Sequence, residues 1–194
     1  MITNNNKTAH LVVDMLYDFI DGSLACQNSI NAVKRSIEYI NENPSQIVVY
    51  IADSHPRNHC SFIENGGIWP THCIVGTKGH QVHEDFYKLV IRPQSRPNKL
   101  NILRKGKNPG QEQYSGFEAE SRFAVKMGEF LVSEGVKDVV ISGIATEYCV
   151  KETAIDLLAA GFKVYVLKDA LSYVDEKGHL ETIKILAERG VIFI

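Results

Sequence analysis

Cys149 is the residue of this sequence best placed to act as a nucleophile. It closes the segment SGIATEYC, which follows an apolar run at 139–141 and precedes apolar residues at helical spacing. Where a strand leads into a helix, free backbone N–H groups and the helix dipole stabilise a thiolate. We therefore expect the pKa of Cys149 to lie below the usual value of about 8.5. A buried structural thiol is the alternative interpretation.

Three charged residues stand where predicted strands end: Asp14, Asp53 and Lys105. Open parallel sheets bind ligands beyond the carboxyl ends of their strands, so we expect these residues to meet Cys149 at one edge of the sheet. There, Asp14 would take the proton of the thiol, with its pKa raised by burial, and Lys105 would stabilise the charges nearby. Taken singly, Asp14 also suits a turn cap and Lys105 a solvated surface position.

The turn before Cys149 could stabilise an oxyanion. It reads Gly143-Ile144-Ala145-Thr146 and brings backbone N–H groups beside the sulfur. We predict that the N–H groups of Ala145 and Cys149 form an oxyanion hole; losing such a donor typically costs on the order of 10² to 10³ in rate. An ordinary strand-to-helix turn is the alternative.

A second group of residues has the composition of a metal site. Asp53 and His55 are two residues apart, so their side chains share one face of an extended segment. Glu64 and His72 follow in the same loop-rich stretch and can return to the same place. Two imidazoles with one or two carboxylates suit Zn²⁺, Fe²⁺ or Mn²⁺. We predict one divalent ion, with zinc the first choice and manganese or iron the alternatives.

The four cysteines offer a different use of zinc. Cys60 and Cys73 lie close to His55 and His72 and could hold a structural ion, although their spacing follows no zinc-finger pattern. The chain has no C-x-x-C pair, and its polar start does not read as a signal peptide. We therefore expect free thiols in a reducing, cytoplasmic setting.

Composition argues against two classes of partner. The chain has 194 residues, of which 44% are apolar and 23% charged, as is ordinary for a globular domain. Its net charge of −2, with both signs mixed, leaves no basic stripe for nucleic acid. No apolar run approaches the roughly 18 residues of a membrane helix. A small molecule is the expected partner, and a homo-oligomer is a candidate assembly.

Alternating strands and helices position the candidate residues. Strands are predicted at 10–13, 47–52, 101–104, 139–144, 162–167 and 191–194, and helices through 30–40, 82–89, 123–131, 150–158 and 180–187. The pattern predicts an α/β fold, a three-layer α/β/α sandwich with a mostly parallel, doubly wound, Rossmann-like sheet of about six strands. We expect one domain over 1–194, in which segment 54–100 is an ordered loop region around the metal and the pocket.

The sequence resembles the nicotinamidase/pyrazinamidase group of the isochorismatase-like cysteine hydrolases. The resemblance rests on four stretches in the family's order: LVVDMLYDF, ADSHPRNHCSFIENGGIWPTHCIVGTKG, RKGKNPGQEQYSGF and SGIATEYCV. It implies an α/β/α fold and hydrolysis of nicotinamide to nicotinate and ammonia through a cysteine thioester, a reaction of NAD salvage. The implied metal holds the pyridine nitrogen, and pyrazinamide is a second candidate substrate.

The resemblance also implies roles for individual residues. The family's catalytic triad falls on Asp14, Lys105 and Cys149. Its metal ligands fall on Asp53, His55 and His72, and a further ligand of some members falls on Glu64.

The pocket wall is implied in the same way. Aromatic positions that enclose the pyridine ring fall on Phe19 and Trp69, and Tyr114 and Tyr148 are further candidates for substrate contact. The bond Ile144–Ala145 falls where the family has a cis peptide. The sequence departs from the family pattern at Ser54, where an aromatic residue is common, and at Glu147, where Asp is frequent.

Two rival interpretations stay open. The first is another amide or isochorismate hydrolase of the same superfamily, whose site does not call for the metal residues. The second is a non-catalytic protein that binds a metal or small molecule in the same pocket. Metal content together with nicotinamide turnover separates the three.

Overall fold

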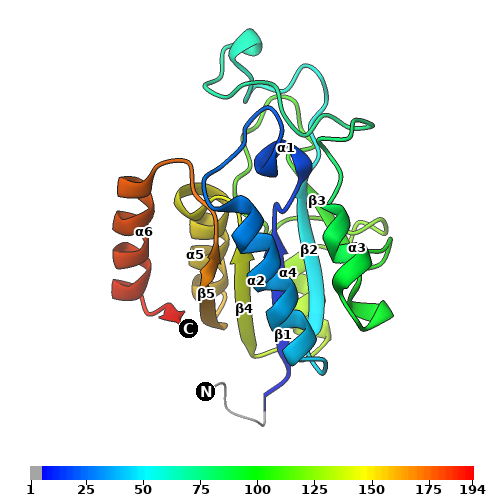
Figure 1. The fold of residues 1–194 in the computed structure, drawn as a ribbon, viewed down its shortest axis with the longest axis vertical. Coiled ribbons are helices and arrows are strands. Elements are labelled where there is room, and N and C mark those ends of the chain that lie inside the picture. Colours follow the sequence, from blue (N-terminus) through cyan, green and yellow to red (C-terminus); the bar gives the residue numbers. More distant parts are fainter. Residues whose placement is uncertain (1–5) are drawn as a thin grey trace.

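The computed structural model describes residues 6–194, and in them six strands form one parallel sheet (Figure 1). The strands are β1 (Thr8–Val13), β2 (Ile47–Asp53), β3 (Ile102–Lys105), β4 (Asp138–Gly143), β5 (Lys163–Leu171) and β6 (Ile192–Phe193). They lie in the order β3-β2-β1-β4-β5-β6, and every neighbouring pair is parallel. The predicted α/β class and strand number are confirmed.

Helices cover both faces of this sheet, as predicted for a three-layer sandwich. On one face lie α1 (Tyr17–Ile20), α2 (Ser29–Glu42) and α3 (Glu84–Leu89); on the other lie α4 (Met127–Ser133), α5 (Lys151–Ala159) and α6 (Glu176–Glu188). Alternate residues of β1 point to opposite faces of the sheet. Leu11 belongs to the core cluster that includes α4 and α5, and Val12 to the cluster that includes α2. Because both faces are covered, the central strands are buried on both sides and mostly apolar, with polar residues such as His10 in β1 and Ser142 in β4 among them.

The strand order reverses at β1, which lies between β2 and β4. The chain first builds outward through β2 to β3 and then returns to β4 on the other side of β1. Such a switch leaves a crevice at the carboxyl ends of the two central strands. Asp14 directly follows β1, and the turn after β4 carries Cys149.

The predicted helix through 123–131 begins later than expected, at Met127. Phe123, assigned to that helix, lies outside it and is 65% exposed. The hydroxyl of Ser121 accepts hydrogen bonds from the backbone N–H groups of Phe123 and Val125, which compete with a helical pattern. Glu120 instead forms a bridge with Arg104 along the outer edge of β3.

Segment 54–100 is mostly loop, with short 3₁₀ turns at Ile63–Asn65 and Pro93–Ser95 besides α3. Its first part, before α3, extends beyond the carboxyl ends of the strands, whereas α3 lies against one face of the sheet (Figure 1). The four cysteines are free thiols, as expected. Across residues 6–194, no helix combines the length and the apolar character needed to cross a membrane.

Candidate active site

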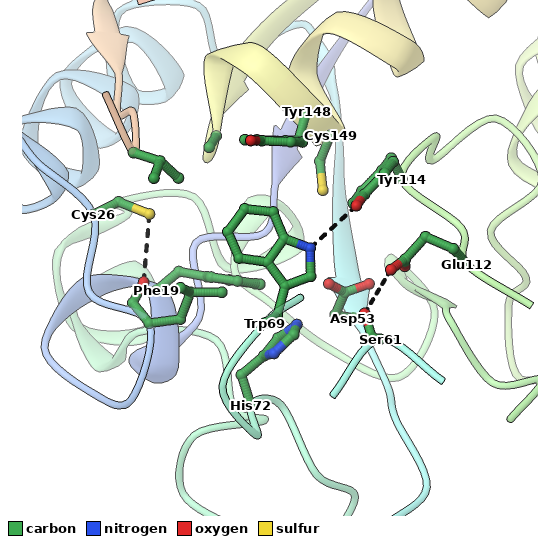
Figure 2. Close-up of a pocket in the computed structure, with 13 residues that line it drawn as sticks. Phe19, Cys26, Asp53, Ser61, Trp69, His72, Glu112, Tyr114, Tyr148 and Cys149 are labelled. Carbon is green, nitrogen blue, oxygen red and sulfur yellow. Dashed lines mark hydrogen bonds between the residues drawn. The ribbon is translucent and has the colours of Figure 1, made fainter. Parts of the chain in front are cut away.

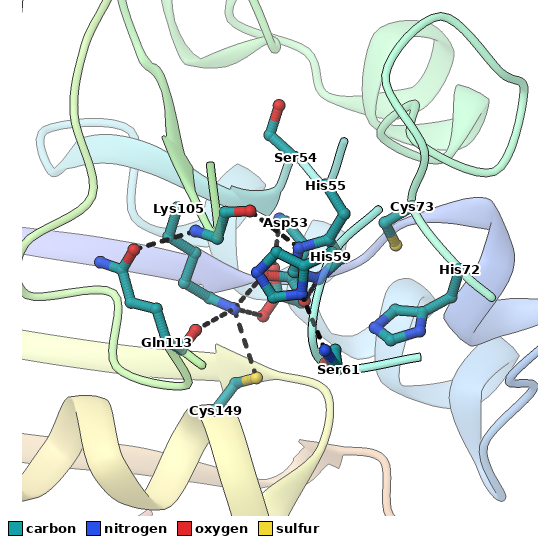
Figure 3. Close-up of polar contacts among 12 residues, drawn as sticks. Asp53, Ser54, His55, His59, Ser61, His72, Cys73, Lys105, Gln113 and Cys149 are labelled. Carbon is teal, nitrogen blue, oxygen red and sulfur yellow. Dashed lines mark hydrogen bonds and ion pairs between the residues drawn. The ribbon is translucent and has the colours of Figure 1, made fainter. Parts of the chain in front are cut away.

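The ends of three strands bring Asp14, Lys105 and Cys149 into one buried cluster. Figure 3 shows Lys105 and Cys149 in it. Lys105 Nζ lies 2.9 Å from Asp14 Oδ2, 3.4 Å from Cys149 Sγ and 2.5 Å from Asp53 Oδ1. Ligand atoms of Asp14, Asp53 and Cys149 all lie within 4.8 Å of one another. The structure thus brings the predicted nucleophile, acid and amine together at one edge of the sheet.

Asp14 is held in place by the neighbouring strand. Its backbone has φ 50°, in the left-handed region, and its N–H donates to the carbonyl of Ile51 at 2.9 Å. Its carboxylate accepts a 2.9 Å hydrogen bond from the N–H of Asp53. A non-glycine residue keeps such a conformation only where its surroundings enforce it, and here β2 does so.

Burial governs the charges of the cluster. It raises the pKa of Asp14 to about 6, against the opposing attraction of Lys105. Burial alone would lower the pKa of Lys105, but Asp14 and Asp53 hold it well above its usual value.

The expected low pKa of Cys149 is wrong. Burial raises the pKa of this thiol well above its usual value, and Asp14 and Asp53 add to the rise, while Lys105 opposes it. The helix start and Lys105 favour the thiolate, but the desolvation of the sulfur and the two carboxylates beside it outweigh them. The resting group is therefore a thiol, whose proton must move as the sulfur reacts.

The turn that carries the nucleophile is anchored near its start. It begins with a cis peptide bond between Ile144 and Ala145 and continues as a π-helical turn, Thr146–Val150, before α5. Thr146 donates its backbone N–H to the carbonyl of Ser172 at 2.9 Å. The carboxylate of Glu147 accepts the backbone N–H groups of Val174 and Asp175. These contacts tie the turn to the segment after β5.

Asp53, His55 and His72 form a second buried group, with ligand atoms within 4.8 Å of one another. The Nδ1–H of His55 donates to the carbonyl of Gly106 at 2.8 Å, and that of His72 to the carbonyl of Pro70 at 2.7 Å. In the neutral form of each ring, this leaves Nε2 as the unprotonated nitrogen. His55 Nε2 is buried 3.5 Å from Asp53 Oδ2 and has no hydrogen-bond partner among the described residues. A carboxylate and two imidazoles oriented in this way fit a divalent metal ion.

The remaining metal candidates lie elsewhere. The structure does not bring Glu64 into this group: it is exposed, and its carboxylate accepts a 2.8 Å hydrogen bond from the hydroxyl of Thr71. Within the part of the chain that the structure describes, neither Cys60 nor Cys73 belongs to a group able to hold an ion.

A pocket opens between the two groups (Figure 2). All four predicted aromatic residues line it, and so do Ala145 and Cys149 of the predicted oxyanion hole. The Trp69 indole N–H donates to the hydroxyl of Tyr114 at 3.1 Å, and the Trp69 ring meets Tyr148 edge-on at 4.9 Å between centroids. The aromatic residues at this pocket are Phe19, Trp69, Tyr114 and Tyr148.

Five further lining residues were not predicted: Leu24, Cys26, Ser61, Glu112 and Val174. The carboxylate of Glu112 accepts a 2.6 Å hydrogen bond from the hydroxyl of Ser61. Glu112 lies in RKGKNPGQEQYSGF, one of the stretches that carry the family resemblance. Its position in the same stretch as Lys105 is the sequence feature that could have predicted its place at the pocket.

Comparison with known proteins places this chain in a family. Residues 111–194 match the Isochorismatase domain. A nicotinamidase of Acinetobacter baylyi is 30% identical over 195 residues, covering 91% of this chain and 86% of that protein.

Two solved structures share the fold. A pyrazinamidase of Pyrococcus horikoshii in complex with zinc aligns with a TM-score of 0.83 and 34% identity, covering 97% of this chain and 98% of that one. PnC1 from L. infantum in complex with nicotinate aligns with a TM-score of 0.79 and 30% identity, covering 97% and 92%. The chain therefore belongs to the nicotinamidase/pyrazinamidase family of isochorismatase-domain proteins.

Proposed function

We propose that this protein hydrolyses nicotinamide to nicotinate and ammonia, with Cys149 as the nucleophile. The observation that carries the proposal is the buried contact of Lys105 Nζ with both Asp14 and Cys149, at the wall of an aromatic pocket. Membership of the nicotinamidase family and the nicotinate held by the related L. infantum protein support the same substrate class.

In the first half of the reaction, the sulfur of Cys149 attacks the carboxamide carbon while its proton passes to Asp14. The backbone N–H groups of Ala145 and Cys149 stabilise the oxyanion. Asp14 then gives its proton to the leaving nitrogen, the C–N bond breaks, and ammonia departs. A thioester between nicotinoyl and Cys149 remains.

In the second half, Asp14 takes a proton from the water that attacks the thioester carbon. The C–S bond breaks, the proton returns to the sulfur, and the acid that forms releases its remaining proton to solvent and leaves as nicotinate. Lys105 stays protonated throughout, because Asp53 remains a carboxylate beside it while Asp14 carries the proton, and in the resting site it holds the Asp14 carboxylate beside the sulfur.

Asp53, His55 and His72 would hold the metal, for which zinc is the first choice given the zinc complex of the related pyrazinamidase. When bound, the ion would act as a Lewis acid toward the pyridine nitrogen and so orient the ring. Phe19 and Trp69 would enclose the ring, with Tyr114 and Tyr148 completing the wall. Glu64 stays outside the proposed ligand set, since Thr71 holds its exposed carboxylate.

The test is ammonia release from nicotinamide by the zinc-loaded protein and by Cys149→Ala. Parent turnover with loss of at least 10³-fold in the variant is expected, since no nucleophile remains. Far-UV circular dichroism and bound zinc should match between the two proteins. Parent-like ammonia release by Cys149→Ala would overturn the covalent mechanism, and release only from other amides would overturn the substrate.

A further inference from the structure

Gln113 lies outside the pocket wall yet touches the catalytic lysine segment twice (Figure 3). Its side-chain Oε1 accepts a 2.9 Å hydrogen bond from the N–H of Gly106. Its backbone carbonyl lies 3.4 Å from Lys105 Nζ. Gln113 is half-buried, and nothing in the mechanism above uses its side chain.

Gly106 links Gln113 to His55, because it forms a hydrogen bond with each of them. Its carbonyl accepts the Nδ1–H of His55 at 2.8 Å, and its backbone has φ +67°. A Cβ on Gly106 would lie 2.4 Å from His55 Cε1, so the backbone of Gly106 packs directly against the imidazole. A shift of Gly106 must therefore move the ring or break its hydrogen bond.

The two residues next to Gln113 hold its loop in place. Glu112 accepts a hydrogen bond from Ser61, and Tyr114 accepts one from Trp69. Because the residues on either side are anchored, the backbone at Gln113 is constrained, and its side chain is held within hydrogen-bond distance of Gly106. Removing Oε1 would leave the N–H of Gly106 without this partner.

We propose that Gln113 is a positioning residue for the metal site: through Gly106 it holds His55 in the Nδ1–H tautomer, with Nε2 free for the ion. The inference rests on the proposed ligand set. His55 Nε2 is the buried atom without a hydrogen-bond partner in that set, so its orientation decides whether the ion is bound well. Losing a contact that orients a ligand typically lowers metal affinity by about 10- to 100-fold.

The experiment measures zinc affinity by competition with a chromogenic chelator, without any turnover. Gln113→Leu removes the acceptor, with a side chain one atom shorter, and should weaken zinc binding by about 10- to 100-fold. Gln113→Glu keeps an oxygen at the same place and should bind zinc as tightly as the parent or more tightly. The matched control is Gln111→Leu, the same change at an exposed position of the same loop, which should leave the affinity unchanged.

A Gln113→Leu protein that is folded and binds zinc within twofold of the parent would overturn the inference. Should that variant fail to fold, Gln113→Asn takes its place, since its shorter amide cannot span the present 2.9 Å contact without movement of the loop. Imidazole nitrogen NMR of the metal-free parent at alkaline pH gives a second reading. The Nδ1–H tautomer of His55 is expected, and a dominant Nε2–H tautomer would also overturn the inference.

The positioning role of Gln113 and the proposed function can fail independently of each other. Weakened zinc binding in Gln113→Leu with no nicotinamide turnover by the parent would support the positioning role and reject the substrate. Nicotinamide turnover by the parent with unchanged zinc affinity in Gln113→Leu would do the reverse.

Discussion

Lowering the pH is expected to destabilise the protein through His10. This histidine is fully buried in β1, and its Nε2 lies 2.9 Å from the hydroxyl of Ser142, which in turn lies 2.8 Å from that of Ser36. Burial lowers the pKa of His10 from 6.5 to about 3, because an imidazolium there would lose its hydration.

The size of the effect follows from the two pKa values. Between pH 6.5 and about 3 the unfolded chain binds a proton at His10 that the folded protein excludes, so the free energy of unfolding falls as the pH falls. Each pH unit in this window is worth about 1.4 kcal/mol. At pH 5, about 1.5 units below 6.5, the loss is roughly 2 kcal/mol relative to neutral pH.

Urea unfolding of the parent and of His10→Gln at pH 7.5 and pH 5 tests this reasoning. Glutamine can still hydrogen-bond to Ser142 but does not titrate, and the other titrating groups are common to both proteins. The parent should therefore lose about 2 kcal/mol more than the variant between the two pH values. Equal losses in the two proteins would refute the argument.

Three further predictions concern the site. Trp69→Phe removes the donor to Tyr114 and should raise the KM for nicotinamide about fivefold, equivalent to about 1 kcal/mol; Tyr114→Phe should do the same, and strictly additive effects in the double variant would contradict a shared bond. Gly106→Ala places a Cβ against His55 and should lower bound zinc after dialysis by tenfold or more; full retention would contradict the packing argument. A chelator should lower the melting temperature, since an ion at 100 times its Kd adds about 2.7 kcal/mol; an unchanged melting curve would mean that no ion binds the folded state tightly.

The convergence of the site residues was predictable because it follows from one rule. Asp14, Asp53 and Lys105 stand at strand ends, and the carboxyl ends of parallel strands meet at one edge. The rule needs only the order of elements, which hydrophobic periodicity reveals. The rule does not show how burial and the charges of Asp14, Asp53 and Lys105 combine at the sulfur, and for that reason the expected direction of the Cys149 pKa shift was wrong.

Loops were less predictable than strands. Glu64 has the right residue type for a metal ligand and lies in the right stretch, but the turn at 63–65 points its carboxylate to Thr71 instead. Glu112 and Gln113 carry no pattern of their own, and their contacts appear only once the loop after β3 is folded against Ser61 and Gly106.

By itself, the sequence determined the parallel sheet, the residues at its carboxyl edge and the family, because these depend on periodicity and on local motifs that short stretches contain. Tertiary structure alone decided how strongly each group is desolvated, which imidazole nitrogen carries the proton, and which loop side chains hold the ligands. Those properties arise from contacts between residues distant in the chain, such as His55 with Gly106, and no local pattern records them.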